Sequence, residues 1–578
     1  MNALRRRIVF ATGQPGGPLL SIADLLILLV LALAVYIGVR LAVSSPQVLQ
    51  GPSINLSTQV LPYYALLSLG RMLAAYILSI LFSLIYGYFA ASKPAAERIL
   101  LPILDVLQSI PILSFLPIVL LGLTAILPGG AGVEIAAVIL IFTSQAWNLT
   151  YSFYQSMKTL PTELREASSV FRFNWWWRFR RMELPFAAIG LLWNSVMSWA
   201  GGWFFLMAAE TFTVGNRDFR LPGLGSYLQQ AASSNNTSAI LWGIGTLVLM
   251  VVLLDQLVWR PLLAWADKFK LEMVESDNPP TSWFLEFLNH SRLATAFTQR
   301  YLIRLLKRID KRLGGALKSG IAPEEKREGM AVMWLRRLLL LLLVMILIVG
   351  VSRLGQLLIT VPLADYGRIA IGALSTALRV IVSLIIALVW TVPLGVTIGS
   401  NPRLATFLQP VVQVVASIPA TALFPVILLA LLNLPGGLNI AAILLMLLGT
   451  QWYVLFNVIA GTTAIPQDLR YTTDLLRFSK VNRWRKLILP ALFPYLVTGL
   501  ITAGGGAWNA SIVAEYTTFN SKTYSVTGLG SIISEATASG NFALLAASTL
   551  TMILIVICLN RYFWRRLYRL AEEKYRME

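Results

Sequence analysis

Long apolar runs with few charges are the feature that most constrains how this chain folds. A helix needs about 20 mostly apolar residues to cross the hydrocarbon core of a bilayer, and twelve runs of the 578-residue sequence are of this kind. The first six fall at 22–43, 60–92, 99–127, 133–157, 185–212 and 239–265. The second six fall at 334–361, 366–399, 404–432, 438–462, 490–518 and 540–563. We therefore expect an all-α integral membrane protein with about twelve transmembrane helices, kinked in Pro-containing runs such as 99–127.

The composition excludes several classes of protein. Hydrophobic residues make up 57% of the chain and charged residues 13%, against about 25% charged in soluble domains. The net charge of +20 would suggest nucleic-acid binding in a soluble protein, but a polytopic membrane protein keeps Lys and Arg on its cytoplasmic side. One cysteine, Cys558, and one histidine, His290, leave no intramolecular disulfide and little scope for zinc or triad chemistry. We expect no catalytic residue, no metal site and no nucleic-acid partner.

Charges in the short loops predict the orientation. Three arginines, Arg5 to Arg7, precede the first run, whereas the loop 44–59 contains no charge. The segment 158–183 contains five arginines, and the C-terminal tail is also basic. Basic loops stay in the cytoplasm, so both termini are expected there, in a multi-pass protein of the inner (plasma) membrane. The first run is long enough to remain as an anchor, and no cleavable signal peptide pattern is present.

The two sets of six runs are copies. Ser109-Ile110-Pro111 recurs as Ser417-Ile418-Pro419, 308 residues later. Further along, the offset settles at 305, which relates Glu210 to Glu515 and Gly223-Leu224-Gly225 to Gly528-Leu529-Gly530. Each copy has an even number of runs, so both insert the same way up, as two parallel six-helix repeats.

The repeat defines three expected parts: a first half at 1–266, a cytoplasmic linker at 267–333, and a second half at 334–578. Apolar positions in the linker, from Tyr301 to Leu313, follow helical spacing among basic residues. This pattern predicts a basic amphipathic helix on the inner leaflet, with membrane lipid as its partner. The linker must at least join the two halves, and contact with partner subunits or with a regulatory ligand is the alternative.

Two cytoplasmic segments carry a pattern of their own, a first loop at 161–183 and a second loop at 466–488. Each opens with a proline, Pro161 or Pro466, which suits a first helical position, and each ends in a basic cluster followed by Leu-Pro. Between these signals, an apolar stripe at helical spacing predicts a short helix outside the membrane. The stripe consists of Leu164, Ala167 and Phe171 in the first loop and of Leu469, Thr472 and Leu476 in the second.

These loops resemble the EAA loop of binding-protein-dependent ABC importer permeases, in which a short coupling helix docks in a groove on a cytoplasmic ATPase. The family pattern runs E-A-A, three residues, G, and about nine residues to a Leu-Pro ending. In the first loop, Glu166-Ala167-Ser168 stands for E-A-A and Arg172 occupies the Gly position. In the second, Tyr471-Thr472-Thr473 replaces E-A-A and Arg477 replaces Gly. The second loop lacks the glutamate, so its docking chemistry is expected to differ.

The surrounding sequence resembles the nitrate/sulfonate/taurine-type branch of these permeases. The shared features are S-I-P with a second Pro six residues on, the pair Trp203/Trp508, an Ala-Glu pair in each half and the later G-L-G. The resemblance covers both halves but not the linker. It implies the type I ABC importer permease fold, with two permeases fused in one chain. It also implies two cytoplasmic ABC ATPase subunits, an external substrate-binding protein, and a small-molecule substrate, often an oxyanion such as nitrate, sulfonate/taurine or bicarbonate.

The energy for transport is expected to come from partners. No phosphate-cradling G-x-x-x-x-G-K-[ST] sequence is present, so ATP and Mg²⁺ would bind the ATPase subunits and no cofactor would bind this chain directly. ATPase closure would draw the coupling helices together and rock the halves. The expected coupling residues are Glu163, Leu164, Glu166, Ala167, Ser168, Phe171, Arg172, Asp468, Leu469, Tyr471, Thr472, Thr473, Leu476 and Arg477.

Several polar or aromatic residues within the runs are candidates for a pathway or gate. Arg71 and Arg379, near the outer ends of their runs, could snorkel to headgroups or attract an anionic substrate. Glu210 and Glu515 could form an outer gate or hydrogen-bond the loop that follows each. The polar outer loops 213–238 and 517–539 could dock a binding protein. The remaining candidates are Gln108, Gln145 and Trp203 in the first half and Gln413, Gln451 and Trp508 in the second.

Two other classes of transporter remain open at this point. An ion-coupled secondary transporter also uses six-plus-six parallel repeats, but it needs an ionisable relay in mid-membrane, for which Asp105 is an isolated candidate. A channel or scaffold is the third possibility. Neither alternative accounts for the paired short helices of the two loops, and neither requires an ATPase partner.

Overall fold

The computed structural model describes residues 51–269 without 128–129 and 215–216, residues 282–290, and residues 348–571 without 417, 464, 466, 520–521, 565 and 568–569, together with a few isolated positions. The expected run at 22–43, the start of the run at 334–361, and the amphipathic helix of the linker lie outside this description. Within it, the chain is helical apart from two short hairpins.

The first half follows one order of elements. It begins with η1 (Thr58–Val60), α2 (Leu61–Ser92), α3 (Pro94–Ser109), α4 (Ile112–Ile126) and α5 (Ala131–Thr159). The first loop and the helix after it comprise α6 (Thr162–Val170), α7 (Trp175–Arg178), a π-helical turn η2 (Phe179–Glu183) and α8 (Leu184–Glu210). There follow β1 (Thr213–Val214), β2 (Arg217–Asp218), α9 (Leu224–Ser233), α10 (Thr237–Leu254), η3 (Asp255–Trp259), α11 (Arg260–Asp267) and, in the linker, α12 (Trp283–His290).

The second half repeats that order. It begins with α16 (Leu363–Ser400), α17 (Pro402–Ala416), α18 (Ala420–Leu431) and α19 (Gly437–Thr463). The second loop and the helix after it comprise α20 (Gln467–Leu475), α21 (Lys480–Arg483), the π-helical turn η5 (Trp484–Ile488) and α22 (Leu489–Ala514). The half closes with β3 (Tyr516–Phe519), β4 (Lys522–Ser525), α23 (Leu529–Ala538), α24 (Phe542–Cys558) and η6 (Leu559–Trp564). The elements from α2 to η3 in the first half and from α16 to η6 in the second follow in the same order, which confirms the predicted internal repeat.

Seven helical stretches of the described chain are long and apolar enough to cross a membrane, and shorter apolar helices accompany them. The run predicted at 99–127 divides into α3 and α4 at Ile110 and Pro111, as its proline content suggested. Pro111 has no N–H and an extended ψ of 115°, so the helix cannot continue through it. The same break separates α17 from α18 at Pro419, which gives the repeated S-I-P sequence a structural role.

The segments after α8 and α22, which were expected to be polar outer loops, have more structure than that expectation suggested. Each contains a two-stranded antiparallel hairpin, β1 with β2 or β3 with β4, followed by a ten-residue helix, α9 or α23. Leu224 and Tyr227 of α9 and Leu529 and Ile533 of α23 are fully buried. These segments are therefore more than polar loops, because each contains a short helix with a buried face that its Gly-, Ser- and Asn-rich composition did not indicate. Strand β3 also begins at Tyr516, inside the run predicted to reach residue 518.

The two halves interlock through the helices that follow the S-I-P breaks. Helix α4 of the first half packs on α22, α23 and α24 of the second, and α18 of the second packs on α8 and α9 of the first. The backbone N–H of Leu113, at the start of α4, donates to Asn509 Oδ1 on α22 at 3.2 Å. Buried apolar residues of both halves belong to one continuous core.

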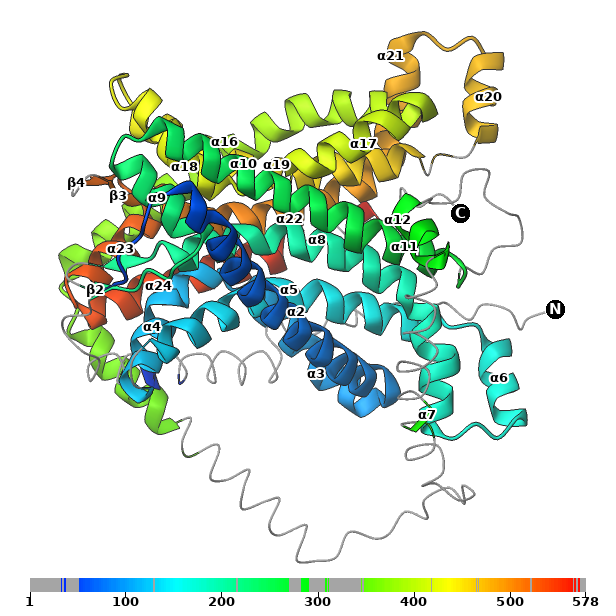
Figure 1. Ribbon diagram of the computed structural model, residues 1–578, viewed down its shortest axis with the longest axis horizontal. Helices are drawn as coiled ribbons and strands as arrows, with labels where there is room; N and C mark the ends of the chain where they lie inside the picture. Colours follow the sequence, from blue (N-terminus) through cyan, green and yellow to red (C-terminus); the bar gives the residue numbers. More distant parts are fainter. Residues whose placement is uncertain are drawn as a thin grey trace, which may run out of the picture.

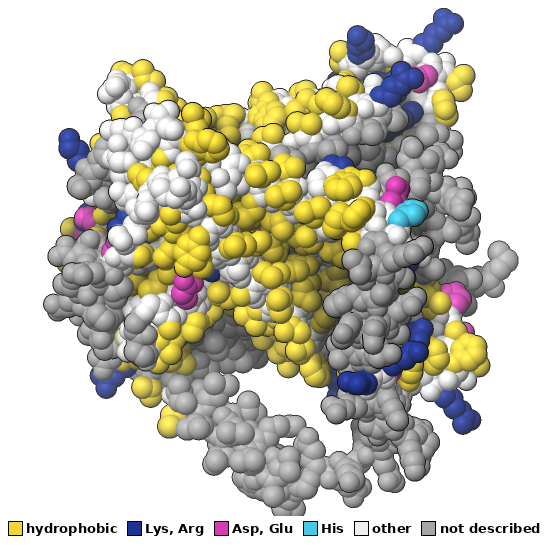
Figure 2. Space-filling model, in the orientation of Figure 1, with side chains coloured by type: hydrophobic (Ala, Val, Ile, Leu, Met, Phe, Trp, Pro, Cys, Tyr) yellow, Lys and Arg dark blue, Asp and Glu magenta, His cyan; other side chains and the backbone are white. Residues whose placement is uncertain are grey.

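The two ends of the molecule carry different secondary-structure elements. Figure 1 shows α6–α7 and α20–α21 at one end, with β2 and the β3–β4 hairpin at the other. This common direction is the one expected for two parallel repeats. Between the ends, Figure 2 shows a broad surface of hydrophobic side chains, with Lys and Arg gathered near the end that carries α6–α7 and α20–α21. The arrangement is typical of a membrane protein whose basic loops face one side.

Candidate functional site

The first loop contains the short helix that the sequence predicted, and the end of that helix has a defined geometry. The N–H of Phe173 donates to the carbonyl of Ser168 at 2.9 Å, and the N–H of Arg172 donates to the carbonyl of Ser169 at 3.0 Å. This pair of bonds is a Schellman motif, which requires a left-handed residue after the helix. Arg172 is that residue, with φ of 49°. The family pattern places Gly at this position, and the backbone conformation explains why.

The second loop ends its helix in the same way. The N–H of Phe478 donates to the carbonyl of Thr473, and that of Arg477 donates to the carbonyl of Asp474, both at 3.0 Å. Arg477 has φ of 48°. Two arginines 305 residues apart therefore share a strained conformation that L-residues rarely adopt. The geometry of the loop is repeated although its sequence has diverged from E-A-A and G.

Side-chain caps then restart the chain as a helix in both loops. Asn174 accepts a hydrogen bond from the N–H of Trp177 at 2.9 Å, and Ser479 accepts one from the N–H of Asn482 at 3.3 Å. Asn and Ser are favoured at this position because their oxygens satisfy helix N–H groups that have no partner within the helix. From each cap, a continuous helix passes through the π-helical turn η2 or η5 into α8 or α22. A fixed turn thus connects each short helix to a spanning helix.

A second connection joins each short helix to the preceding spanning helix. Arg165 of α6 donates from Nη2 to the carbonyl of Met157 in the last turn of α5, at 2.6 Å, and Arg470 of α20 donates to the carbonyl of Thr462 in the last turn of α19. Neither arginine was among the expected coupling residues. Their position in matching E-L-R and D-L-R sequences was the available signal. The side chains of Ser168 and Thr473 are buried and hydrogen-bond the carbonyls of these arginines.

The exposed faces of α6 and α20 differ. In the first loop, Glu163 and Glu166 are exposed and Phe171 is 71% exposed. In the second, Tyr471 and Leu476 are each 62% exposed. Leu164 and Ala167 are half-buried, Leu469 and Thr472 are exposed, and the side chain of Asp468 lies outside the description. Ser168 and Thr473, two of the expected coupling residues, are buried and so do not belong to the exposed faces of α6 and α20.

Different ion pairs stabilise the two loops. Arg483 of α21 forms an ion pair with Asp474 of α20 at 2.9 Å, which ties the two helices of the second loop together. In the first loop, the equivalent Arg178 instead pairs with Glu183 of η2 at 2.7 Å. Asp310 of the linker accepts a hydrogen bond from Trp176 Nε1 at 3.0 Å and also pairs with Arg180. The linker therefore contacts the first loop.

At the end of the molecule that carries the β-hairpins, the buried side chain of Arg71 lies in a network of charged groups of the first half. Its side chain is 5% exposed, and it forms two hydrogen bonds of 2.7 Å with Glu134 and an ion pair of 2.8 Å with Glu210. Glu210, fully buried, also accepts from Ser68 Oγ at 2.6 Å and from the N–H of Gly225 at 2.8 Å. The carboxylate thus joins α2, α8 and the start of α9.

The second half repeats this network with one change. Arg379 forms an ion pair of 2.8 Å with Glu515, which also accepts from Thr376 Oγ1 at 2.7 Å and from the N–H of Gly530 at 2.9 Å. The position of Glu134 is occupied by Asn439, whose Oδ1 accepts from Nε and Nη2 of Arg379. The network of the first half therefore contains two carboxylates around one arginine, and that of the second half contains one.

The G-L-G sequences complete both networks. A Cβ atom on Gly223 would lie 2.3 Å from a Glu210 oxygen, and one on Gly528 would lie 2.1 Å from a Glu515 oxygen. Both glycines have extended backbones, with φ of 179° and −174°, so the need for glycine is steric. The carboxylates can approach the backbone only because no side chain is there.

These contacts change the interpretation of the four charged candidates. Arg71 and Arg379 are paired within the protein, so they do not extend to lipid headgroups in this structure. Glu210 and Glu515 each hydrogen-bond groups of their own half, including the segment that follows. This is the second of the two arrangements considered for them. The sequence identified all four residues as candidates, but it did not indicate that the arginine and the glutamate of each half form an ion pair.

The polar and aromatic pathway candidates are mostly packed between helices. Gln145 is fully buried, with Nε2 3.6 Å from the sulfur of Met72, and Gln451 is 5% exposed. Trp203 and Trp508 are 1% and 4% exposed. Gln108 is exposed. The side chains of Gln413 and Asp105 lie outside the description.

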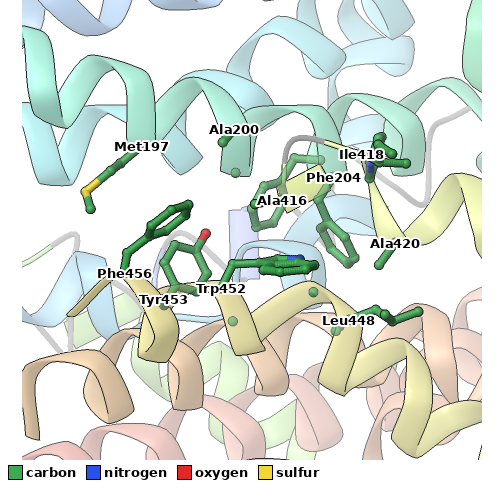
Figure 3. A pocket seen from close by; sticks show the side chains of 16 residues that line it. Met197, Ala200, Phe204, Ala416, Ile418, Ala420, Leu448, Trp452, Tyr453 and Phe456 are labelled. Carbon is green, nitrogen blue, oxygen red and sulfur yellow. The ribbon is translucent and has the colours of Figure 1, made fainter. Parts of the chain in front are cut away.

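A cavity of about 70 Å³ lies between the halves and contains none of the predicted pathway residues. It is bounded by α8 of the first half and by the α17–α18 junction, α19 and α22 of the second. Figure 3 shows Phe204 on one side and Trp452, Tyr453 and Phe456 on the other, all near the same space. Among the described residues, no group of three or more His, Cys, Asp or Glu side chains could hold a metal ion.

The paired loops, the parallel repeat and the helical membrane surface agree with one family of proteins. The family model described as "Binding-protein-dependent transport system inner membrane component" matches residues 80–258 and again residues 391–569. The chain belongs to this family. It contains two such domains, one per half, and is therefore a fused importer permease. Family membership and the seven candidate spans make it a multi-pass inner-membrane transport protein.

Curated relatives of this permease come from the branch that the sequence resembles. The nitrate import permease protein NrtB of Leptolyngbya laminosa is 30% identical over 182 residues, which cover 32% of this chain and 62% of the relative. The bicarbonate transport system permease protein CmpB of Synechococcus elongatus is 33% identical over 159 residues, or 27% of this chain and 55% of the relative. The taurine transport system permease protein TauC of Escherichia coli is 25% identical over 137 residues, or 24% and 48%. The chain thus spans about half of these relatives' lengths.

Proposed function

We propose that this permease imports a small solute, an oxyanion such as nitrate, a sulfonate, taurine or bicarbonate, with energy from two ATPase subunits docked on α6 and α20. The observation that carries the proposal is the pair of short helices, which lie at one end of the molecule in matching positions (Figure 1). Each is joined to two spanning helices, through Arg165 or Arg470 on one side and through a capped turn on the other.

This construction suits the transmission of force. An ATPase that pulls on α6 would move α5 and α8, which pack closely against each other. One that pulls on α20 would move α19 and α22, which are packed in the same way. Closure of two ATPases on ATP would draw the two loops together and rock the halves about their interface, which is the type of motion that gives alternating access. The proposal places the loops and both termini in the cytoplasm, in line with the basic residues near that end (Figure 2).

The opposite end is the proposed docking face for an external substrate-binding protein. The β1–β2 and β3–β4 hairpins lie there, and α9 and α23 anchor them by their buried faces. The Arg71–Glu210 and Arg379–Glu515 networks hold these segments against the spanning helices. With a rigid outer face, the contacts that a docked binding protein makes would depend on the relative position of the two halves.

The test is a mild-detergent pull-down of the tagged full chain, followed by mass spectrometry and an ATPase assay of the recovered material. We expect an ATP-hydrolysing subunit at two copies per chain. Recovery of the chain alone, across several detergents, would contradict the proposal. That result would favour an ion-coupled secondary transporter and would direct attention to Asp105.

A variant refines the same test. Glu166→Lys reverses the charge on an exposed side chain of α6, and we expect it to impair ATPase stimulation and uptake while leaving membrane insertion intact. Glu286→Lys, on an exposed position of α12, is the matched charge-reversal control. Normal uptake in Glu166→Lys would count against docking through this face.

A further inference from the structure

The cavity between the halves lies close to the pseudo-twofold axis of the repeat. Two pairs of residues that the offset of 305 relates, Gly201 with Gly506 and Phe205 with Ala510, line this one cavity. A Cβ atom on Gly201 would lie 2.9 Å from the hydroxyl oxygen of Tyr453, and one on Gly506 would lie 3.7 Å from its ring. A residue and its repeat mate can border the same small space only where the axis that relates them passes nearby. Helices α8 and α22 therefore meet at the axis between the halves.

One face of α19 borders this space. Figure 3 shows Trp452, Tyr453 and Phe456 of α19 near it, with Phe204 of α8 on the other side. The α19 residues that line the cavity recur after one or about four positions, which is the spacing of a single helix face. They are Leu448, Gly449, Trp452, Tyr453 and Phe456. This face is aromatic and aliphatic, and its polar groups are one phenol hydroxyl and one indole N–H.

The corresponding face of α5 is polar. Of the five positions, three gain a hydroxyl group, one exchanges a tyrosine for an asparagine, and one is tryptophan in both halves. The α5 residues are Thr143, Ser144, Trp147, Asn148 and Tyr151, in the order of their α19 mates, and all five are half-buried. Because a parallel repeat relates the halves by an axis along the membrane normal, the α5 face is directed toward that axis from the side opposite to α19.

Helix α22 adds an amide to the polar side. Asn509 is the repeat mate of Phe204, and its Oδ1 accepts from the N–H of Leu113 at the start of α4, at 3.2 Å. Its Nδ2 donates to the carbonyl of Gly505 at 3.0 Å, and an amide nitrogen carries a second N–H that can donate elsewhere. Asn509 therefore fixes a hydrogen-bond donor where α4 and α22 meet.

The two sides of the junction suit a solute unequally. An oxyanion that leaves water needs hydrogen-bond donors in its place, and hydroxyl and amide groups supply them. Polar side chains within spanning helices usually face a bundle interior or a water-filled route. Passage also requires binding weak enough for release, which neutral donors allow better than a buried cation does. None of the described residues on the α5 face or in the cavity lining is charged.

We propose that the solute passes along one wall of the junction, where Ser144 and Asn148 of α5 and Asn509 of α22 hydrogen-bond its oxygen atoms. The aromatic face of α19 is the opposite wall, which does not bind it. Ser144 Oγ donates to the carbonyl of Ile141 at 2.6 Å in this structure and would exchange that bond for one to the solute. The oxygen-bearing solute rests on the proposed function, whereas the choice of wall rests on the packed repeat.

Thiol labelling tests the choice of wall without any partner subunit. Single cysteines are placed at two repeat-related pairs, Asn148→Cys with Tyr453→Cys and Ser144→Cys with Gly449→Cys, in a Cys558→Ser background because Cys558 is exposed. The full chain in nanodiscs is treated with 2-sulfonatoethyl methanethiosulfonate, an anionic reagent of the size of a small solute. We expect the α5 member of each pair to react about tenfold faster, since a thiol in apolar surroundings is less ionised and less accessible. Equal rates in both pairs, or faster reaction on α19, would overturn the proposal.

Uptake tests the role of the amide itself. Nitrate, bicarbonate and taurine are the probes, in proteoliposomes that contain the full chain with its co-purifying subunits. Asn148→Leu should raise the KM of the transported probe about tenfold, the effect of losing a hydrogen bond to a charged group, while Asn148→Ser, which keeps a donor, should recover most of that loss. Tyr453→Phe, which removes only the hydroxyl of the repeat mate, should leave the KM unchanged. An unchanged KM in Asn148→Leu, or an increase in Tyr453→Phe as large as that in Asn148→Leu, would refute the assignment.

The outcomes separate this inference from the proposed function. Recovery of two ATPase copies together with equal labelling of both walls would leave the importer standing and remove the polar wall. Faster labelling of α5 in a chain that recovers no ATPase would keep the polar wall and contradict the importer.

Discussion

Arg165 is joined to Met157 by a hydrogen bond that ties the helix α6 of the first loop to the end of α5. The guanidinium Nη2 lies 2.6 Å from the Met157 carbonyl oxygen, and Arg470 makes the equivalent contact with Thr462. Carbonyls in the last turn of a helix have no partner within it, and a cation there also interacts favourably with the helix dipole. We infer that these two arginines transmit movement of α6 and α20 to the spanning helices.

Replacing either arginine should therefore uncouple ATP hydrolysis from transport. In Arg165→Gln or Arg470→Gln, a charged hydrogen bond worth about 1.5–3 kcal/mol is lost, while the exposed faces of α6 and α20 keep their residues. We expect the ATPase subunits to co-purify normally and uptake per ATP hydrolysed to fall about tenfold. The measurement is paired uptake and phosphate release in proteoliposomes. Lys480→Gln, an exposed change in the second loop, is the control, and an unaltered ratio in both arginine variants would contradict the inference.

The Arg71–Glu210 and Arg379–Glu515 networks should respond unequally to the same substitution. Glu210→Gln leaves Arg71 paired with Glu134, whereas Glu515→Gln leaves Arg379 with the neutral amide of Asn439. A buried charge that loses its partner costs about 3–5 kcal/mol. Glu515→Gln should therefore lower the thermal unfolding temperature of the purified protein more than Glu210→Gln does.

The first network can be converted to the composition of the second as a check. Glu134→Gln alone should be mild, because Glu210 still balances Arg71, but Glu134→Gln with Glu210→Gln should destabilise the protein as strongly as Glu515→Gln. Scanning fluorimetry in one detergent measures all four variants. Equal shifts for the two single carboxylate variants Glu210→Gln and Glu515→Gln would show that the second carboxylate has no stabilising role.

A methyl group at either outer glycine should disrupt the same networks. Gly223→Ala or Gly528→Ala would bring a Cβ atom within about 2.3 Å of a carboxylate that is held by an arginine, a hydroxyl and a backbone N–H. Displacing the carboxylate would sacrifice several buried hydrogen bonds, so a loss of at least about 2 kcal/mol of stability is expected. The same measurement applies, with Gly245→Ala, at an open position, as the control. A shift no larger than the control's would mean that the carboxylate relaxes freely.

Several features of the fold could be predicted because they depend on local sequence. The apolar runs, the breaks at Pro111 and Pro419 and the helices α6 and α20 all follow from residues close together in the chain. The constant offset of the repeat then related the two halves without any structure. Arg172 was recognised as occupying a glycine position, and its φ of 49° gives that departure a physical meaning.

Other features depend on contacts that local sequence does not specify. Arg71 lies 63 residues from Glu134 and 139 from Glu210, and nothing in the spacing indicates that the three meet. Burial of Gln145, Trp203 and Trp508 follows from how the helices rotate against each other. The cavity is formed by segments of both halves, so its lining could be assembled only from the packed structure.

The left-handed arginines provide a final test, which separates backbone conformation from side-chain contact. An L-residue in this conformation costs about 1–2 kcal/mol, and glycine removes that strain, although it also increases the entropy of the unfolded chain. Arg172→Gly should therefore retain α6, with exchange protection of the Phe173 N–H, which donates to Ser168, at or slightly above the wild-type level. Arg172→Val should lose that protection, because a β-branched residue is rarely tolerated there.

Uptake then distinguishes the two roles of this arginine. If Arg172 is present only to complete the turn, Arg172→Gly should transport normally and Arg172→Val should not, and Arg477→Gly should behave in the same way in the second loop. Hydrogen exchange of the loop, measured on the same preparations as uptake, shows whether the turn is intact in each variant. Loss of uptake in Arg172→Gly with full protection of the Phe173 N–H would mean that the guanidinium itself contacts the ATPase, in which case the two loops dock through a basic side chain where the family pattern has none.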